Sequence, residues 1–165
     1  GLGDSDPEAS AAFRRKVISL RRAVLGAVRT AGEVSDRLDH LKEAIRATPP
    51  AGPETAAELE RLRDELNRVQ AALRGDRTRS ERNIPQTPSI RDRVERIAGD
   101  QWYTTTAPTG THREGYRYAA EAFADELTRL RQLVGDLQAL ESELERMGAP
   151  WTPGRLPDWQ LDPQQ

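Results

Sequence analysis

The sequence predicts an all-α protein: an elongated up-down helical bundle of two long and two shorter helices, with an ordered, non-helical C-terminal tail. Two long stretches carry apolar residues at a seven-residue rhythm, and proline and glycine groups interrupt the pattern at their ends. The composition agrees, because 32% charged, 36% hydrophobic and 5% aromatic residues are typical of helices that bury one stripe. These observations disfavour a β-sandwich or a barrel.

The first long helix is expected to begin at Asp6, Pro7 and Glu8. These residues combine a helix cap, a proline suited to the first helical position and an acid near the positive helix end. The helix should end before Pro49 and Pro50 after roughly 40 residues, or about 60 Å. Its apolar stripe consists of Phe13, Val17, Leu20, Val24, Ala27, Ala31, Val34, Leu38, Leu41 and Ile45.

Shorter elements are expected in the middle of the chain. A second helix should span residues 52–75, and its short proline-rich connection implies an antiparallel hairpin with the first helix. Residues 75–86 are polar and Arg-rich, so we expect an exposed, mobile loop. A third helix should begin at residues 87–89 and end at Gly99. The β-branched run and proline of residues 102–108 favour an extended segment.

The second long helix is expected near Thr111, which has capping-box spacing to Glu114. Its apolar stripe continues to Met147. The tail that follows holds three prolines, and we expect it to fold back on the bundle as a clasp that buries Trp151 and Trp159. In the alternative, both tryptophans contact another part of a larger protein.

One domain is expected over residues 6–159, since a chain of 165 residues can bury one core. Residues 1–5 are expected to be a linker or a cloning remnant, and residues 160–165 a disordered tail. The sequence does not begin with methionine, so we expect a piece of a longer protein.

The two histidines do not form an evident catalytic or metal site. His40 is close in sequence to Asp36 and Glu43, but it lies outside the apolar stripe, whereas di-iron bundles project their ligands inward. We therefore expect a surface histidine. His112 falls at the start of the last helix, where a capping role is expected, and no cysteine or serine-glycine elbow accompanies it.

Other reactive groups are equally unpromising, and we expect no catalytic, metal-binding or cofactor-binding residue and no cofactor. Glu141, Glu143 and Glu145 are expected to form a solvated face. The sequence has no cysteine, which excludes thiolate catalysis and Cys-ligated zinc. Neither the P-loop nor the dinucleotide-binding glycine pattern occurs.

The charge balance argues against nucleic acid and membrane partners. The formal net charge is −2, so no bulk positive field attracts phosphates. The four arginines within residues 74–82 are interrupted by two acids, and no aromatic residue lies among them to stack on bases. No stretch approaches the ~18 apolar residues of a membrane span.

Four residues are candidates for contact with a partner: Ile18, Leu25, Trp151 and Trp159. Ile18 and Leu25 are seven residues apart, on a flank about 100° from the stripe of the first helix. We expect this flank to be covered by the short third helix or by another molecule.

The segments Thr104–Thr109, Ala119–Phe123 and Gly148–Pro157, together with Tyr116, resemble the C-terminal helical region of bacterial sortilin-like, BNR-repeat β-propeller proteins, often labelled glycosyl hydrolases. In that family an Asp-Pro pair starts the helical segment, as Asp6 and Pro7 would here. The resemblance implies a secreted or periplasmic parent protein whose propeller and small β-domain are the partners of this segment. Any chemistry would then reside in the propeller, and no catalytic residue of the family maps onto this chain.

Two functions are therefore considered. The first is a non-catalytic structural or partner-contacting helical domain, the C-terminal accessory domain of a larger β-propeller protein, which is not itself an enzyme. The alternative is a self-associating coiled-coil module that forms a homo-oligomer, motivated by the long apolar stripes and the flank of Ile18 and Leu25.

Overall fold

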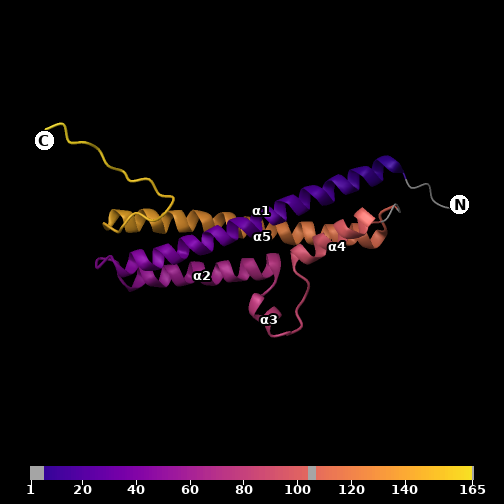
Figure 1. Cartoon of the computed structure of the whole chain (residues 1–165), viewed down its shortest axis with the longest axis horizontal. Helices are drawn as coiled ribbons and strands as arrows, with labels where there is room; N and C mark the ends of the chain where they lie inside the picture. The colour runs from indigo at the N-terminus through magenta and orange to yellow at the C-terminus, as the bar shows by residue number, and fades with distance from the viewer. Residues whose placement is uncertain (1–5, 104–106, 165) are drawn as a thin grey trace.

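The computed structural model describes residues 6–103 and 107–164 of the chain, and in these residues it confirms the all-α bundle. The described residues form five helices and no strand (Figure 1). The helices are α1 (Pro7–Arg46), α2 (Pro53–Arg74), α3 (Arg77–Glu81), α4 (Ile90–Tyr103) and α5 (Gly110–Arg146). Residues 1–5, expected to be a linker or a cloning remnant, lie outside the described part.

In cross-section the bundle consists of three helical rods. Two are the long helices α1 and α5, and the third is formed by α2 followed by α4 along a single side of them (Figure 1). The 40-residue α1 and the 37-residue α5 run in the same direction, while the 22-residue α2 and the 14-residue α4 run back against them. Thus α2 covers one half of the long helices and α4 covers the other half. The two shorter helices act as one interrupted rod.

The predicted bounds of α1 are confirmed, since the helix spans 40 residues. The Asp6 side chain accepts a hydrogen bond from the backbone N–H of Glu8 at 3.0 Å, and Pro7 occupies the first helical position. Beyond the helix, the buried Thr48 hydroxyl donates to the Ala44 carbonyl at 2.6 Å. The prolines then turn the chain into α2, which forms the expected antiparallel hairpin with α1.

The break between α2 and α4 contains more structure than the sequence predicted. Gly75, with φ of 86°, ends α2, and residues 75–89 bulge away from the bundle (Figure 1). The expected loop over residues 75–86 is exposed, but it contains the five-residue α3, because the Asp76 side chain accepts from two backbone N–H groups. Ser89 and Asp92 then cap α4 reciprocally, at 3.1 and 3.2 Å.

The prediction that the third helix ends at Gly99 was wrong. Helix α4 continues to Tyr103, and the extended segment expected over residues 102–108 does not begin before residue 104. Glycine inside a helix costs about 1 kcal/mol relative to alanine, but packing outweighs that cost here. Ile97, Ala98 and Gln101 are buried on both sides of Gly99.

The start of α5 also differs from the expected capping box of Thr111 and Glu114. The cap is Thr109, whose hydroxyl accepts from the backbone N–H of His112 at 3.2 Å. In return, the imidazole Nδ1 of His112 accepts from the backbone N–H of Thr109, also at 3.2 Å. The expected capping role of His112 is confirmed, with a ring nitrogen in the place of the usual carboxylate.

The core follows the predicted stripes. Its main cluster runs along α1, α2 and α5, with fully buried leucines at Leu38, Leu62, Leu66 and Leu137. A smaller cluster lies near the start of α1. It consists of Phe13, Val17, Ile97 and Ala98, and Tyr116 packs against it. There the rings of Phe13 and Tyr116 meet edge to face at 5.7 Å.

The sequence suggested that Glu141 lies on a solvated face, and this prediction was wrong. The residue, in α5, is only 1% exposed. Both of its carboxylate oxygens accept hydrogen bonds from the Arg37 guanidinium of α1, with the Nε donor at 3.3 Å. A bidentate pair of this kind satisfies the buried carboxylate and links the two parallel helices. Glu143 is exposed, as expected.

The tail is non-helical, but the predicted tryptophan clasp was wrong. Trp159 is 76% exposed, and Figure 1 shows the last residues projecting away from the bundle. The contact with the bundle is made by Arg155 instead, which donates to Glu145 at 2.6 and 2.8 Å and to Ser142 at 3.1 Å. Hydrogen bonding to Arg155 lowers the pKa of the Glu145 carboxyl below its usual value. Ala149 is buried at the start of the tail.

We predict that Arg37→Ala lowers the free energy of unfolding by about 3 kcal/mol, because it leaves the Glu141 carboxylate buried without its partner. This is the lower end for a buried pair, since the Arg37 side chain is partly exposed. The double variant Arg37→Leu/Glu141→Leu should recover most of that loss, since an apolar pair needs no ionic partner. Urea unfolding measures both. Equal losses in the single and the double variant would mean that packing, not the unpaired charge, sets the cost.

The tail gives a second prediction. Ending the chain after Met147 removes both Ala149 and Arg155, and should lower the melting temperature by about 2 to 4 °C, the shift that corresponds to ~1 kcal/mol in a chain of this size. Ending it after Leu156 keeps both contacts and should leave the melt unchanged. A drop in the longer variant would restore a stabilising role for Trp159.

Candidate functional site

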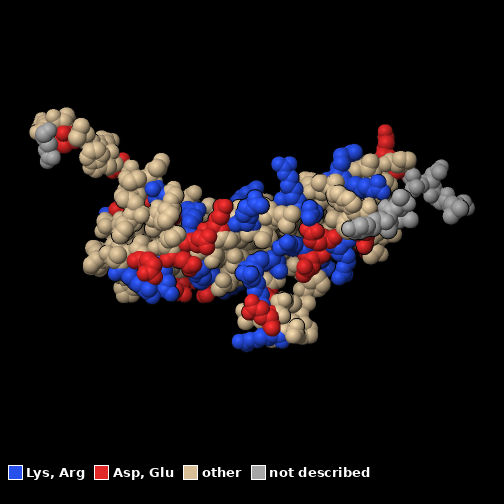
Figure 2. Space-filling view, viewed as in Figure 1, with Lys and Arg blue, Asp and Glu red and all other residues tan. Residues whose placement is uncertain are grey.

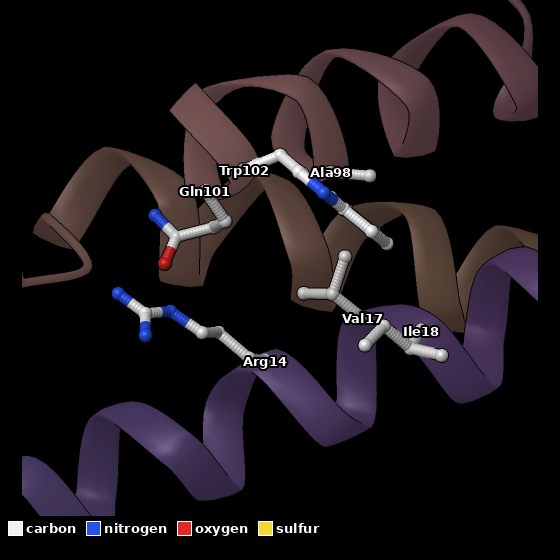
Figure 3. Close-up of a pocket in the computed structure, with 6 residues that line it drawn as sticks. All are labelled: Arg14, Val17, Ile18, Ala98, Gln101 and Trp102. Atoms are coloured by element: carbon white, nitrogen blue, oxygen red, sulfur yellow. The ribbon is translucent and has the colours of Figure 1, made fainter. Parts of the chain in front are cut away.

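An apolar groove lies between α1 and α4 at the end of the bundle that holds the start of α1 (Figure 3). Its volume is about 240 Å³. The lining side chains are Arg14, Val17 and Ile18 from α1 and Ala98, Gln101 and Trp102 from α4.

The floor of the groove is buried and its walls are exposed. Val17 and Ala98 belong to the smaller core cluster and form the floor. Ile18 is 50% exposed and Trp102 is 71% exposed, and in Figure 3 the indole of Trp102 reaches over Val17. Large apolar side chains held in water beside a buried floor are typical of a surface that a partner covers.

Polar atoms at one end of the groove are buried and unpartnered. Gln101 is only 7% exposed, and within the described residues its Oε1 and the Nε of Arg14 have no hydrogen-bond partner. Figure 3 shows the two side chains facing each other across the groove. An unmet buried donor or acceptor costs about 1 to 3 kcal/mol. The Arg14 Nε is a donor and the Gln101 Oε1 an acceptor, so a small rotation of either side chain would pair the two atoms with each other.

The orientation of the Gln101 amide follows from its neighbour His112. The Nδ1 atom of that ring accepts from the backbone N–H of Thr109 and so carries no proton, and it shares its single lone pair with the Gln101 amide, 3.2 Å away. The Gln101 NH₂ group therefore faces His112, and its carbonyl oxygen faces the groove. The ring Nε2 lies 3.2 Å from an oxygen of Asp100, which completes the link between the end of α4 and the start of α5.

The structure separates the four residues that the sequence proposed for partner contact. Ile18 lines the groove, whereas Leu25 is half-buried and outside it. Trp151 and Trp159 lie beyond α5, at the opposite end of the bundle. Helix α4 meets the flank of α1 through the ion pair of Arg21 with Glu95 at 2.9 Å, but it leaves Ile18 half exposed. The predicted cover is therefore partial.

Sequence reasoning missed Gln101 and Trp102, because it ended the helix at Gly99. The available signal was the helical spacing of these residues, which follow the apolar Ile97 and Ala98 by four positions each. Extending the third helix by one turn would have placed both on the face that meets α1.

The tail forms a second exposed apolar surface, at the other end of the molecule. Its exposed members are Trp151, Leu156, Trp159 and Leu161. Residues 156–165 contain two acids, Asp158 and Asp162, and no lysine or arginine. The tail is therefore an apolar and acidic peptide.

The remaining candidates for chemistry are scattered. His40 is exposed, as its place outside the stripe predicts. Across residues 6–103 and 107–164, no group of three or more His, Asp and Glu side chains is arranged to hold a metal ion. None of the described helices combines the length and the apolar character needed to cross a bilayer. On the face shown in Figure 2, acidic and basic side chains are mixed along the bundle.

In comparisons with known proteins, no family model matches the chain, and no curated protein or solved structure is significantly similar to it.

The groove yields a prediction about stability. Ile18→Gln should change the free energy of unfolding by no more than about 0.5 kcal/mol, because the side chain is half exposed and belongs to neither core cluster. Val17→Ala, its neighbour on the floor, should cost about 2 kcal/mol through lost burial and a new cavity. Chemical unfolding of the two variants compares them directly. A large loss of stability in Ile18→Gln would show that the Ile18 side chain stabilises the fold and is not free for a partner.

Proposed function

We propose that this chain is a non-catalytic, partner-contacting helical domain. The observation that supports the proposal is the groove between α1 and α4, which combines exposed apolar walls with a buried apolar floor. Burying Ile18 and Trp102 at an interface would stabilise the complex by the hydrophobic effect.

The dimensions of the groove favour a protein partner over a small molecule. Sites for small ligands usually enclose ~300 to 1,000 Å³ and surround most of the ligand, whereas this groove holds about 240 Å³ and is open along one side. A space of that size fits one large side chain of a partner. Protein interfaces commonly depend on a tryptophan or arginine anchored in such a pocket.

The nature of the partner rests on the sequence resemblance to sortilin-like, BNR-repeat β-propeller proteins. On that basis the chain is the C-terminal accessory domain of a larger, secreted or periplasmic protein, and it contacts the propeller and small β-domain of that protein. Part of the resemblance, Thr104–Thr106, lies outside the described residues. Tail residues Gly148–Pro157, which carry another part, surround the Arg155 contact with α5.

The experiment that tests this proposal begins with the coding sequence upstream of residue 1, where a propeller is expected. The longer product and the isolated chain are then prepared with Trp151→Phe and Trp159→Phe, each with and without Trp102→Phe. The iodide quenching of Trp102 is taken from the difference between each such pair, and it is compared between the longer product and the isolated chain. Docking should protect Trp102 in the longer product. Equal quenching would show that the groove does not contact the rest of the parent protein. An upstream sequence unrelated to a propeller would contradict the proposed parent.

A separate assay tests the absence of catalysis. The isolated chain should not hydrolyse glycoside substrates, because the described cavities that an acid lines hold a single carboxylate each, Asp36 or Asp76, and glycoside hydrolysis needs a pair. Turnover that survives repeated purification and is lost on an Asp or Glu substitution would contradict the proposal.

A further inference from the structure

We propose that a hollow at the break between α2 and α4 binds a small ligand through two or three linked phosphate groups. The hollow lies against the middle of α1 and has a volume of about 590 Å³. Three arginines line it: Arg74 at the end of α2, Arg77 at the start of α3 and Arg91 in the first turn of α4. This arginine hollow shares no lining residue with the groove between α1 and α4, so the inference goes beyond the proposed function.

The three arginines of the hollow have no acidic partner. Other arginines between the helices are paired, as Arg21 of α1 is with Glu95 of α4 at 2.9 Å. Within the described part of the chain, Arg74, Arg77 and Arg91 form no ion pair and no side-chain hydrogen bond. Arg74 is half-buried, and the other two are exposed. Their guanidinium groups are therefore available to an anion from solution.

The nearby acids leave a surplus of positive charge. Among the described lining residues Asp36 is the one acid, so three arginines against one aspartate give the hollow a formal charge of +2. Asp76 and Asp92, the acids beside Arg77 and Arg91 in sequence, accept hydrogen bonds from backbone N–H groups at the starts of α3 and α4. An oxyanion in the hollow thus finds donors that no carboxylate occupies.

The donors of the hollow suit linked phosphates better than a single carboxylate. Each guanidinium presents five N–H donors in a planar fork that matches two oxygens of a phosphate. Three such forks, carried by three different helices, offer more donors than one carboxylate can accept. A diphosphate or a triphosphate has enough oxygens and enough negative charge for all three. The amide of Gln70, on the wall formed by α2, adds a neutral donor.

The size and the surroundings of the hollow favour a small ligand over a nucleic acid. Its volume falls within the ~300 to 1,000 Å³ of ordinary ligand sites. None of the described lining residues is aromatic, so no ring is present to stack on a base. The net charge of the chain is −2, which disfavours a long polyanion. In Figure 2, basic side chains gather where the excursion of residues 75–89 leaves the bundle.

Gly32 keeps the wall formed by α1 open. It lines the hollow, and a Cβ added there would meet no side chain of another element within 4 Å. A larger side chain at this position would therefore extend into empty space. Leucine also favours a helix more than glycine does, so the hollow can be filled without weakening α1.

The test measures binding to the full chain by isothermal titration calorimetry at low salt. The probes are tripolyphosphate and ATP, which share three linked phosphates, and an oligothymidine of about twelve nucleotides. Tripolyphosphate and ATP should both bind and raise the melting temperature. The tighter of the two identifies the source of the phosphates, a free oligophosphate or a nucleotide. If the oligothymidine bound more tightly than either, the surface would be a nucleic-acid site and the inference would be wrong.

Two matched double variants separate a site from general charge attraction. Arg77→Gln/Arg91→Gln removes two arginines of the hollow. Arg79→Gln/Arg82→Gln removes two exposed arginines of the same excursion that do not line it. The first variant should weaken tripolyphosphate binding at least about tenfold and the second less than about twofold, although both lose the same charge. Equal losses would overturn the inference.

Gly32→Leu tests the hollow without changing its charge. It should weaken tripolyphosphate binding at least about tenfold, while the melting temperature stays the same or rises. Circular dichroism checks that all variants stay folded. Unchanged affinity in Gly32→Leu, or no binding of either phosphate compound at about 1 mM, would contradict the proposed site. None of these substitutions touches the groove of Trp102, so the outcome is independent of the partner-contacting function.

Discussion

The whole structure depends on one constraint: the apolar stripe of the 40-residue α1 must be covered along its entire length. The parallel α5 covers one side of it, and the other side needs a helix of similar length running back. The chain supplies that helix in two pieces, α2 and α4, whose stripes meet α1 in succession. The excursion of residues 75–89 and the groove beside the last turns of α4 both follow from this division.

Parallel helices that no short loop connects need another device to fix their relative height, and the pairing of Arg37 with Glu141 provides it. A shift of α5 by one turn would leave the 1% exposed carboxylate without its guanidinium, whereas the leucines on either side would meet other apolar residues of the stripe. Apolar packing tolerates such shifts better than a buried charge does. The apolar stripes hold α1 and α5 together, and the ion pair selects one alignment of the two helices along their length.

The sequence was sufficient for the helices and the core, and insufficient where tertiary contacts override local preference. Caps, prolines and seven-residue spacing predicted α1 and its hairpin with α2. Gly99 led to the wrong end for the third helix. The helix continues through this glycine because Ile97 and Gln101, on either side of it, are buried against the bundle. Glu141 occupies the stripe position between Leu137 and Leu144, so the spacing could have indicated its burial. Its partner could not be recognised, since only the fold brings Arg37 opposite it. For the site, Ile18 was found from its position on the helix, but its neighbours on α4 were lost with the last turn of that helix.

The interruption between α2 and α4 has a consequence for which changes of sequence the chain can accept. Helices α2 and α4 are held by their own contacts with α1 and α5, so the path between them carries no core residue before Ser89. Lengthening a surface path costs only about 0.6 kcal/mol for each doubling of its length. Residues 76–88 are therefore the place where inserted sequence, a protease cut or new chain ends would be accepted while the three rods stay assembled.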